Sequence, residues 1–140
     1  LIDAATALLV RTPERFDVLV TTNFYGDIIS DLASELSGSL GLAGSILASD
    51  TQCCAQAQHG SAPDIAGQDR ANPVSMMLSI AMMMKWLGDH HRRSDLIEIG
   101  KIMEQAVDTV LADPYLRTSD LGGPVGCADF GRAVSAAVTA

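Results

Sequence analysis

Apolar residues recur every three or four positions along much of the chain, which is the spacing of an α-helix with one buried face. The clearest case runs from Asp95 to Leu111, and its expected core positions are Leu96, Ile99, Met103, Ala106, Val107 and Val110. Four other stretches predict helices: Asp3–Val10, Gly26–Leu36, Asn72–Leu87 and Ala128–Val138. In the predicted helix Asn72–Leu87, Asn72 is the expected N-cap and Pro73 fits the first turn. Gly88 is the expected end of that helix.

Other patterns interrupt the helices. The short run from Phe16 to Thr22 is rich in β-branched residues, which predicts a buried strand. Small residues dominate from Ser37 to Ser45, where we expect a bend or crossover. The stretch from Ser49 to Ala71 predicts a long irregular loop, and loops of that length within a compact domain are usually functional or disordered.

Length and composition narrow the class of protein. The chain has 140 residues, 48% of them hydrophobic, enough for one domain with a sizeable core. A formal net charge of -8 gives no basic surface for nucleic acid or an anionic membrane, and the apolar stretch Pro73–Leu87 is too short to span a bilayer. Three cysteines, two of them adjacent, argue against a disulfide framework. We therefore expect a cytoplasmic protein that binds neither nucleic acid nor membranes.

Two carboxylates, Asp27 and Asp31, lie four residues apart and so fall on one face of the predicted helix. Like charges at this spacing repel each other by a few tenths of a kcal/mol unless a cation lies between them. Oxygen ligands of this kind suit Mg²⁺ or Mn²⁺. Aspartate pairs are also common on solvated helices, so the spacing alone leaves both interpretations open.

The loop from His59 to Gly67 is rich in small residues and leads into the helix that Asn72 caps. Glycine and serine allow backbone amides to approach a ligand closely, and a helix start favours an anion. An ordinary surface loop has the same composition, and a single histidine is more often structural than catalytic. From composition alone, the ordinary loop is the favoured interpretation.

Two longer sequence motifs favour the functional interpretation of both features. The run from Asp17 to Leu32, with its Gly-Asp-x-x-Ser-Asp pattern, resembles the strand-to-helix metal motif of the β-decarboxylating dehydrogenases of the isopropylmalate, tartrate and isocitrate type. The loop His59–Gly67, followed by Ala71–Pro73, resembles the adenosine-binding loop of the same family. The resemblance implies an α/β fold of which this chain is the helix-rich C-terminal portion. Residues 1–37 would end the small dimerising domain, and residues 38–140 would be the C-terminal part of the large NAD-binding domain.

The same resemblance implies a metal site and a dinucleotide site. Asp27 and Asp31 would hold Mg²⁺ or Mn²⁺ together with Asp3, which would act at the site of a partner subunit in a homodimer. The implied NAD-binding residues are His59, Gly60, Ser61, Ala62, Pro63, Asp64, Ile65 and Asn72. Asp64 can accept hydrogen bonds from ribose hydroxyls and would repel the 2′-phosphate of NADP. Relatives that use NADP have Lys and Tyr in place of Asp64 and Ile65, so we expect NAD.

The implied reaction is metal-dependent oxidation of a 2-hydroxy acid by NAD, followed by loss of CO₂. The family's catalytic lysine and tyrosine match no position in this chain, so we assign no catalytic residue here and expect the isolated chain to be inactive. Gln56 stands where the family has glutamate, near the nicotinamide end. A non-catalytic remnant or regulatory subunit of the same family is therefore an alternative, and a purely structural helical module is another.

Overall fold

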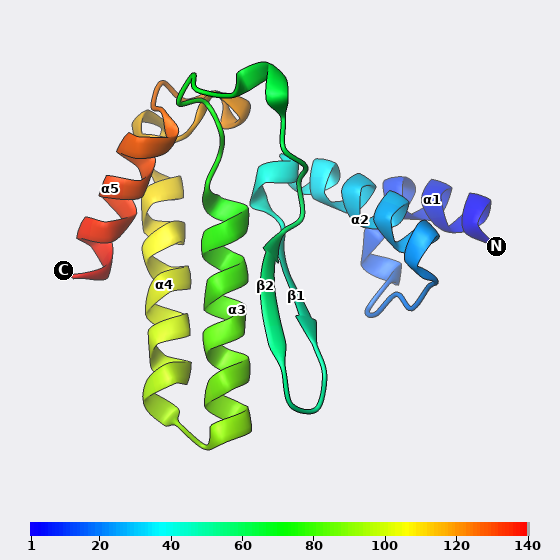
Figure 1. The fold of residues 1–140 in the computed structure, drawn as a ribbon. Helices are drawn as coiled ribbons and strands as arrows, with labels where there is room; N and C mark the ends of the chain where they lie inside the picture. The colour runs from blue at the N-terminus through cyan, green and yellow to red at the C-terminus, as the bar shows by residue number, and fades with distance from the viewer. Residues whose placement is uncertain (140) are drawn as a thin grey trace.

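A computed structural model describes residues 1–139, and Figure 1 shows how its elements are arranged. Within this range the chain forms five α-helices and one two-stranded sheet. The helices are α1 (Ile2–Arg11), α2 (Asn23–Ser37), α3 (Val74–His91), α4 (Ser94–Ala112) and α5 (Cys127–Val138), and the strands are β1 (Gly44–Ala48) and β2 (Cys53–Ala57). All five helices occur where hydrophobic spacing predicts them, although their ends differ by a few residues.

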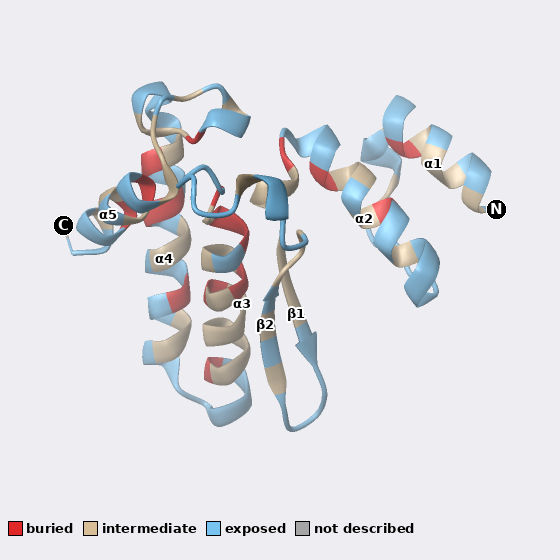
Figure 2. Cartoon of the chain, turned by 45° about the horizontal axis from the view of Figure 1, so that its top comes forward, coloured by how far each residue is buried: buried red, intermediate tan, exposed pale blue. Residues whose placement is uncertain are grey.

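Helices α3 and α4 form an antiparallel hairpin, against which α5 packs at one end and the strands pack along the other side of α3 (Figure 1). Buried residues gather where α3, α4 and α5 meet, as Figure 2 shows. The core cluster consists of Val74, Ala106, Val107, Val110, Phe130 and Val134. It holds the start of α3 against α5, and this junction leads directly into the predicted nucleotide loop.

The buried face of α4 only partly matches its prediction. Ala106, Val107 and Val110 are buried as expected, but Ile99 is 41% exposed. The reason is that α3 approaches α4 at Gly100, where an added Cβ would lie 2.7 Å from the carbonyl oxygen of Ala81. The two backbones come too close there for an isoleucine to lie between them.

A β-hairpin occupies parts of the stretches that predict a bend and an irregular loop, so those predictions were wrong there. The strands β1 and β2 are antiparallel, with Gly44 opposite Ala57 and Ala48 opposite Cys53. Ser79 of α3 contacts both strands: its Oγ accepts the amide of Ser45 at 2.9 Å, and its hydroxyl hydrogen is shared between the carbonyl oxygens of Gln56 at 2.9 Å and Ser75 at 2.7 Å. Small residues hide this strand pattern from a hydrophobicity analysis.

The strand predicted from Phe16 to Thr22 does not form. The segment has a bend at Asp17, no strand among residues 1–139 pairs with it, and Val18 and Val20 are 76% and 92% exposed. A strand needs a neighbour for its backbone N–H and C=O groups, so β-branched composition alone does not produce one.

The predicted helix stop at Gly88 was also wrong, since α3 continues to His91. Gly88 is buried inside the helix because Ile97 and the carbonyl oxygen of Arg93 lie within 3 Å of where a Cβ would be. Arg92 then ends the helix in the left-handed conformation at φ +55°. In the part of the chain that the structure describes, no helix has the length and apolar character to cross a bilayer.

Candidate functional site

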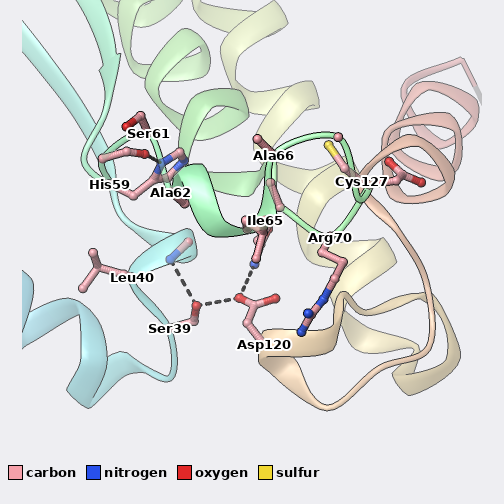
Figure 3. Close-up of a pocket in the computed structure, with 16 residues that line it drawn as sticks. Ser39, Leu40, His59, Ser61, Ala62, Ile65, Ala66, Arg70, Asp120 and Cys127 are labelled. Atoms are coloured by element: carbon pink, nitrogen blue, oxygen red, sulfur yellow. Dashed lines mark hydrogen bonds between the residues drawn. The ribbon is translucent and has the colours of Figure 1, made fainter.

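A cavity of about 690 Å³ lies where the loop before α3 meets η2 (Leu40–Leu42), η5 (Ser119–Leu121) and the start of α5 (Figure 3). Its walls are residues 39–41, most of the loop from 59 to 72, and the two residues Asp120 and Cys127. Three distant parts of the sequence therefore enclose one space. Such concave sites with a few polar groups are typical of small-molecule and cofactor binding.

The cavity gathers most of the residues that the sequence predicts for NAD. Among the lining residues are His59, Gly60, Ser61, Ala62, Ile65 and Asn72. Pro63 and Asp64 are not part of the lining, although they belong to the short helix η3 (Pro63–Ile65) that carries Ile65. The Asp64 residue is exposed, so its carboxylate is open to solvent beside the cavity and not enclosed by it.

The backbone of this loop is strained at Ala62. Its φ of +41° lies in the left-handed region, which a residue with a Cβ rarely adopts. The conformation is fixed by the 3₁₀ turn that follows, in which the amide of Ile65 donates to the carbonyl oxygen of Ala62 at 3.1 Å. Such strain concentrates at ligand-binding segments, so this outlier supports a binding role for the loop.

Asp120 is the polar centre of the cavity wall, a role that no local pattern in the sequence indicates. Its carboxylate accepts hydrogen bonds from Ser39 Oγ at 2.6 Å, Thr118 Oγ1 at 2.6 Å and Asn72 Nδ2 at 2.9 Å. Figure 3 shows the bonds from Ser39 and from the loop converging on it. Partial burial raises the pKa of Asp120, but the three hydrogen bonds outweigh it and hold the pKa below its ordinary value. The carboxylate therefore stays ionised.

Asn72 connects the cavity to helix α3. Its Oδ1 accepts the backbone amide of Val74 at 3.0 Å, so it caps the helix as the sequence predicts. Its Nδ2 donates to Asp120 on the other side. The side chain is 8% exposed, and both of its polar atoms are engaged. One residue thus fixes both the helix start and the cavity wall.

Asp69 joins the loop to helix α5. Its Oδ1 accepts the amide of Ala128 at 2.9 Å, and its carbonyl oxygen accepts the amide of Cys127 at 3.0 Å. Because those amides belong to the first turn of α5, the contact also places a negative charge at the positive end of the helix dipole. Arg70, the next residue, lines the cavity and is its one lining arginine or lysine. The lining therefore combines small and apolar residues with one cation, Arg70, and two carboxylates, Asp69 and Asp120.

The predicted metal ligands do not come together within the chain. Asp27 and Asp31 are exposed on α2, and Asp3 is exposed on α1. Among residues 1–139, no three His, Cys, Asp or Glu side chains are close enough to hold a metal ion. Asp27 and Asp31 are hard oxygen donors on one open helix face, which fits part of a Mg²⁺ or Mn²⁺ site. The contribution of Asp3 to the site of a partner subunit stays a prediction.

Comparison with known proteins places this geometry in a family. Residues 1–134 match the family model of isocitrate/isopropylmalate dehydrogenases. The chain is 48% identical over 134 residues to the isocitrate/homoisocitrate dehydrogenase of Thermus thermophilus, covering 96% of this chain and 38% of that protein. It is 44% identical over 142 residues to a 3-isopropylmalate dehydrogenase of a Synechococcus species, covering 98% of this chain and 35% of that protein.

The fold agrees with the sequence comparison. The crystal structure of isocitrate dehydrogenase from Methylococcus capsulatus superposes on 99% of this chain with a TM-score of 0.90 at 40% sequence identity. The chain spans 40% of that protein, so it corresponds to a part of the relatives it matches. The helix-rich, partial fold that the motifs implied is thereby confirmed. This chain belongs to the isocitrate/isopropylmalate dehydrogenase family.

Proposed function

We propose that this chain supplies the NAD-binding cavity and two metal ligands of an enzyme that oxidises and decarboxylates a 2-hydroxy acid. The substrate would be of the 3-isopropylmalate, tartrate/malate or isocitrate type. One observation carries the proposal: the residues that the sequence assigns to NAD, except Pro63 and Asp64, line a single cavity. That cavity is built by side chains from three separate segments, so its shape is not a property of the loop alone.

In this proposal the cavity binds the adenosine half of NAD. The apolar side chain of Ile65 and the backbone around Gly60 form a surface for the adenine, while Asp120 holds Asn72 in place beside it. The exposed carboxylate of Asp64 accepts hydrogen bonds from the ribose hydroxyls, each worth about 1.5–3 kcal/mol for a charged acceptor. A phosphate on the 2′-oxygen would meet that carboxylate as a like charge, which favours NAD over NADP.

The carboxylates of Asp27 and Asp31 would hold Mg²⁺ or Mn²⁺, with Asp3 contributed across a homodimer. When bound, the metal and the nicotinamide would supply the acidity of the substrate hydroxyl, the hydride acceptor and stabilisation of the enolate. The role of Asp27 and Asp31 is to orient the cation on one helix face. They need no large side-chain movement to do so, because both already project from the same side of α2.

A non-catalytic relative is the second candidate, and Gln56 is the residue that favours it. Gln56 lies exposed on β2, where the family resemblance places a glutamate. An amide in that position carries no charge and cannot act as a base. Such a protein would keep nucleotide binding and lose turnover, so binding and activity must be measured separately.

The test is calorimetric titration of the purified protein with NAD and with NADP, each with and without MnCl₂. We expect NAD to bind at least about tenfold more tightly than NADP, a difference of about 1.4 kcal/mol. Ala66→Trp, which fills the cavity, should abolish binding. Ala112→Trp, at an exposed position near the end of α4, should not. Absence of NAD binding by the folded protein would refute the proposal, and binding without oxidation of any of the three substrate types would favour the non-catalytic relative.

A further inference from the structure

Gln58 lies between the two candidate sites and contacts both of the elements that carry them. Its side-chain Nε2 donates to Ser34 Oγ at 3.1 Å and makes a longer contact of 3.4 Å to Asp31 Oδ1, both on α2. Its backbone amide donates to Ser75 Oγ at 3.1 Å, in the first turn of α3. The residue that follows is His59, the first loop residue of the nucleotide cavity.

The direction of these hydrogen bonds is determined by chemistry. Ser34 is 6% exposed, and its hydroxyl hydrogen is used in a 2.8 Å bond to the carbonyl oxygen of Ser30. Its oxygen is therefore available only as an acceptor for the amide of Gln58. Turning the amide over would place its oxygen against both the Asp31 carboxylate and the Ser34 lone pairs. The orientation with nitrogen toward α2 is the one that satisfies all three groups.

Helix α2 has few other connections to the rest of the fold. It packs against η2, where Glu35 Oε1 accepts the amide of Leu40 at 3.1 Å. Beside this contact lies a hollow of about 250 Å³ with Ser34, Leu42 and Gln58 among its lining residues. Because this space is not filled by apolar packing, the Gln58 side chain is the polar connection across it. A change in the position of α2 would therefore reach the start of the loop at His59 through Gln58, in addition to reaching the cavity wall through η2, which follows α2 in the chain.

We propose that Gln58 is a positioning residue that couples metal binding at Asp31 to nucleotide binding at the loop beginning with His59. The inference rests on the function proposed above. When Asp31 is held as a ligand, its hydrogen bond fixes the amide of Gln58 and so restricts the start of the loop. Fixing the loop restricts Gln58 and Asp31 in the same way, since coupling between two binding sites is reciprocal.

The experiment measures four dissociation constants by calorimetry of the purified protein. These are the values for NAD without and with saturating Mn²⁺, and for Mn²⁺ without and with saturating NAD. We expect each ligand to tighten the other by the same factor, about fivefold or more. Gln58→Leu replaces the amide with an apolar branched side chain one bond shorter and so removes the donor. The factor should therefore fall to about one while each ligand alone binds within about twofold of the original.

Two further variants make the result specific. Ser34→Ala removes the acceptor on α2 and should weaken the coupling without touching either ligand. Gln105→Leu makes the same chemical change at an exposed position of α4 and should leave the coupling intact. Circular dichroism shows whether each variant is folded, and Ser34→Ala provides the test if Gln58→Leu is not.

Full coupling in the Gln58→Leu and Ser34→Ala variants would overturn the inference and leave the proposed function standing. Absence of coupling in the original protein, with both ligands bound, would overturn it as well. Failure of the original protein to bind NAD at all would overturn the proposed function together with this inference.

Discussion

Asn72 and Asp120 lie 48 residues apart in the sequence, and Asn72 Nδ2 donates to Asp120 Oδ2 at 2.9 Å. The same asparagine caps helix α3 through Val74. The start of helix α3 and the cavity wall are therefore linked through this pair, because the side chain that completes the wall also satisfies the helix terminus. A carboxylate with three side-chain donors is also a rigid acceptor, since Ser39, Asn72 and Thr118 each hold it from a different position.

Replacing Asp120 with Asn should destabilise the protein and weaken NAD binding. The amide oxygen of asparagine is an uncharged and therefore weaker acceptor. Its NH₂ group would face side chains that are themselves donors, so at least one of the three bonds would be lost. Because Asp120 is partly exposed, we expect a loss of about 1–2 kcal/mol in the free energy of unfolding. Urea denaturation measures it. Asp108→Asn on exposed α4 is the matched control, and equal losses in the two variants would contradict the role of the network.

The Asp120 network should also make stability depend on pH in a definite direction. Burial raises the pKa of Asp120, but its hydrogen bonds lower that pKa by more than burial raises it. The pKa in the folded state therefore lies below the value of about 3.9 expected for the unfolded chain. The stabilisation is therefore present above about pH 4 and is lost as pH falls through the folded-state pKa. The difference in unfolding free energy between the original protein and Asp120→Asn should shrink on acidification from about pH 6 to about pH 3. A constant difference would show that the carboxylate charge contributes nothing.

The helices were predictable because their signals are local. Hydrophobic spacing within α4 and the Asn72 cap depend only on neighbours a few residues away. The role of Asp120 was not predictable from one sequence, since its partners Ser39 and Asn72 are 81 and 48 residues distant. Nothing in the local pattern distinguishes Asp120 from a carboxylate in an ordinary turn.

The errors in the strands have the same origin. A strand is defined by its partner, so Phe16–Thr22 has the composition of a strand and remains unpaired among the described residues. The hairpin of β1 and β2 is the opposite case: its sequence does not look like a strand, yet it forms one. Its small residues have low strand propensity, and packing against α3 orders them. The wrong helix stop has a related cause, because a glycine can serve packing as well as a turn. Gly88 predicts the end of a helix, but in the structure it lies inside α3 at a position where Ile97 packs too closely for a larger residue.

Asp64→Asn should reduce the discrimination between NAD and NADP. The substitution removes the negative charge near the expected 2′-position and keeps an acceptor for the ribose. Two exposed charges about 4 Å apart repel by about 1 kcal/mol in water, so we expect NADP affinity to rise about fivefold with little change for NAD. Competitive calorimetric titration measures both. Asp50→Asn, exposed in the turn between β1 and β2, is the control for a general effect of charge.

Gly100→Ala should lower the free energy of unfolding. The new Cβ would lie 2.7 Å from the carbonyl oxygen of Ala81 and 2.8 Å from Cγ of Lys85, so α3 and α4 would have to separate. We expect a loss of about 1–3 kcal/mol, even though alanine is the better helix former. Gln105→Ala on the exposed side of α4 should change stability by less than about 0.5 kcal/mol. A stabilised Gly100→Ala variant in urea denaturation would show that the two helices are not in contact at this position.

Arg92→Gly should raise the free energy of unfolding, by removing strain at the end of α3. Arg92 adopts φ +55° and ψ +41°, and the following amide of Arg93 closes the helix by donating to the carbonyl oxygen of Gly88 at 2.8 Å. An L-residue with a Cβ is disfavoured in this conformation by about 1–2 kcal/mol, and glycine avoids that penalty. Glycine also makes the unfolded chain more flexible, so we expect a net gain of about 0.5–1 kcal/mol. Arg92→Ala separates the two effects, because it removes the charged side chain and retains the strained backbone. If the alanine and glycine variants were equally stable in urea, the left-handed conformation would not be the source of the gain.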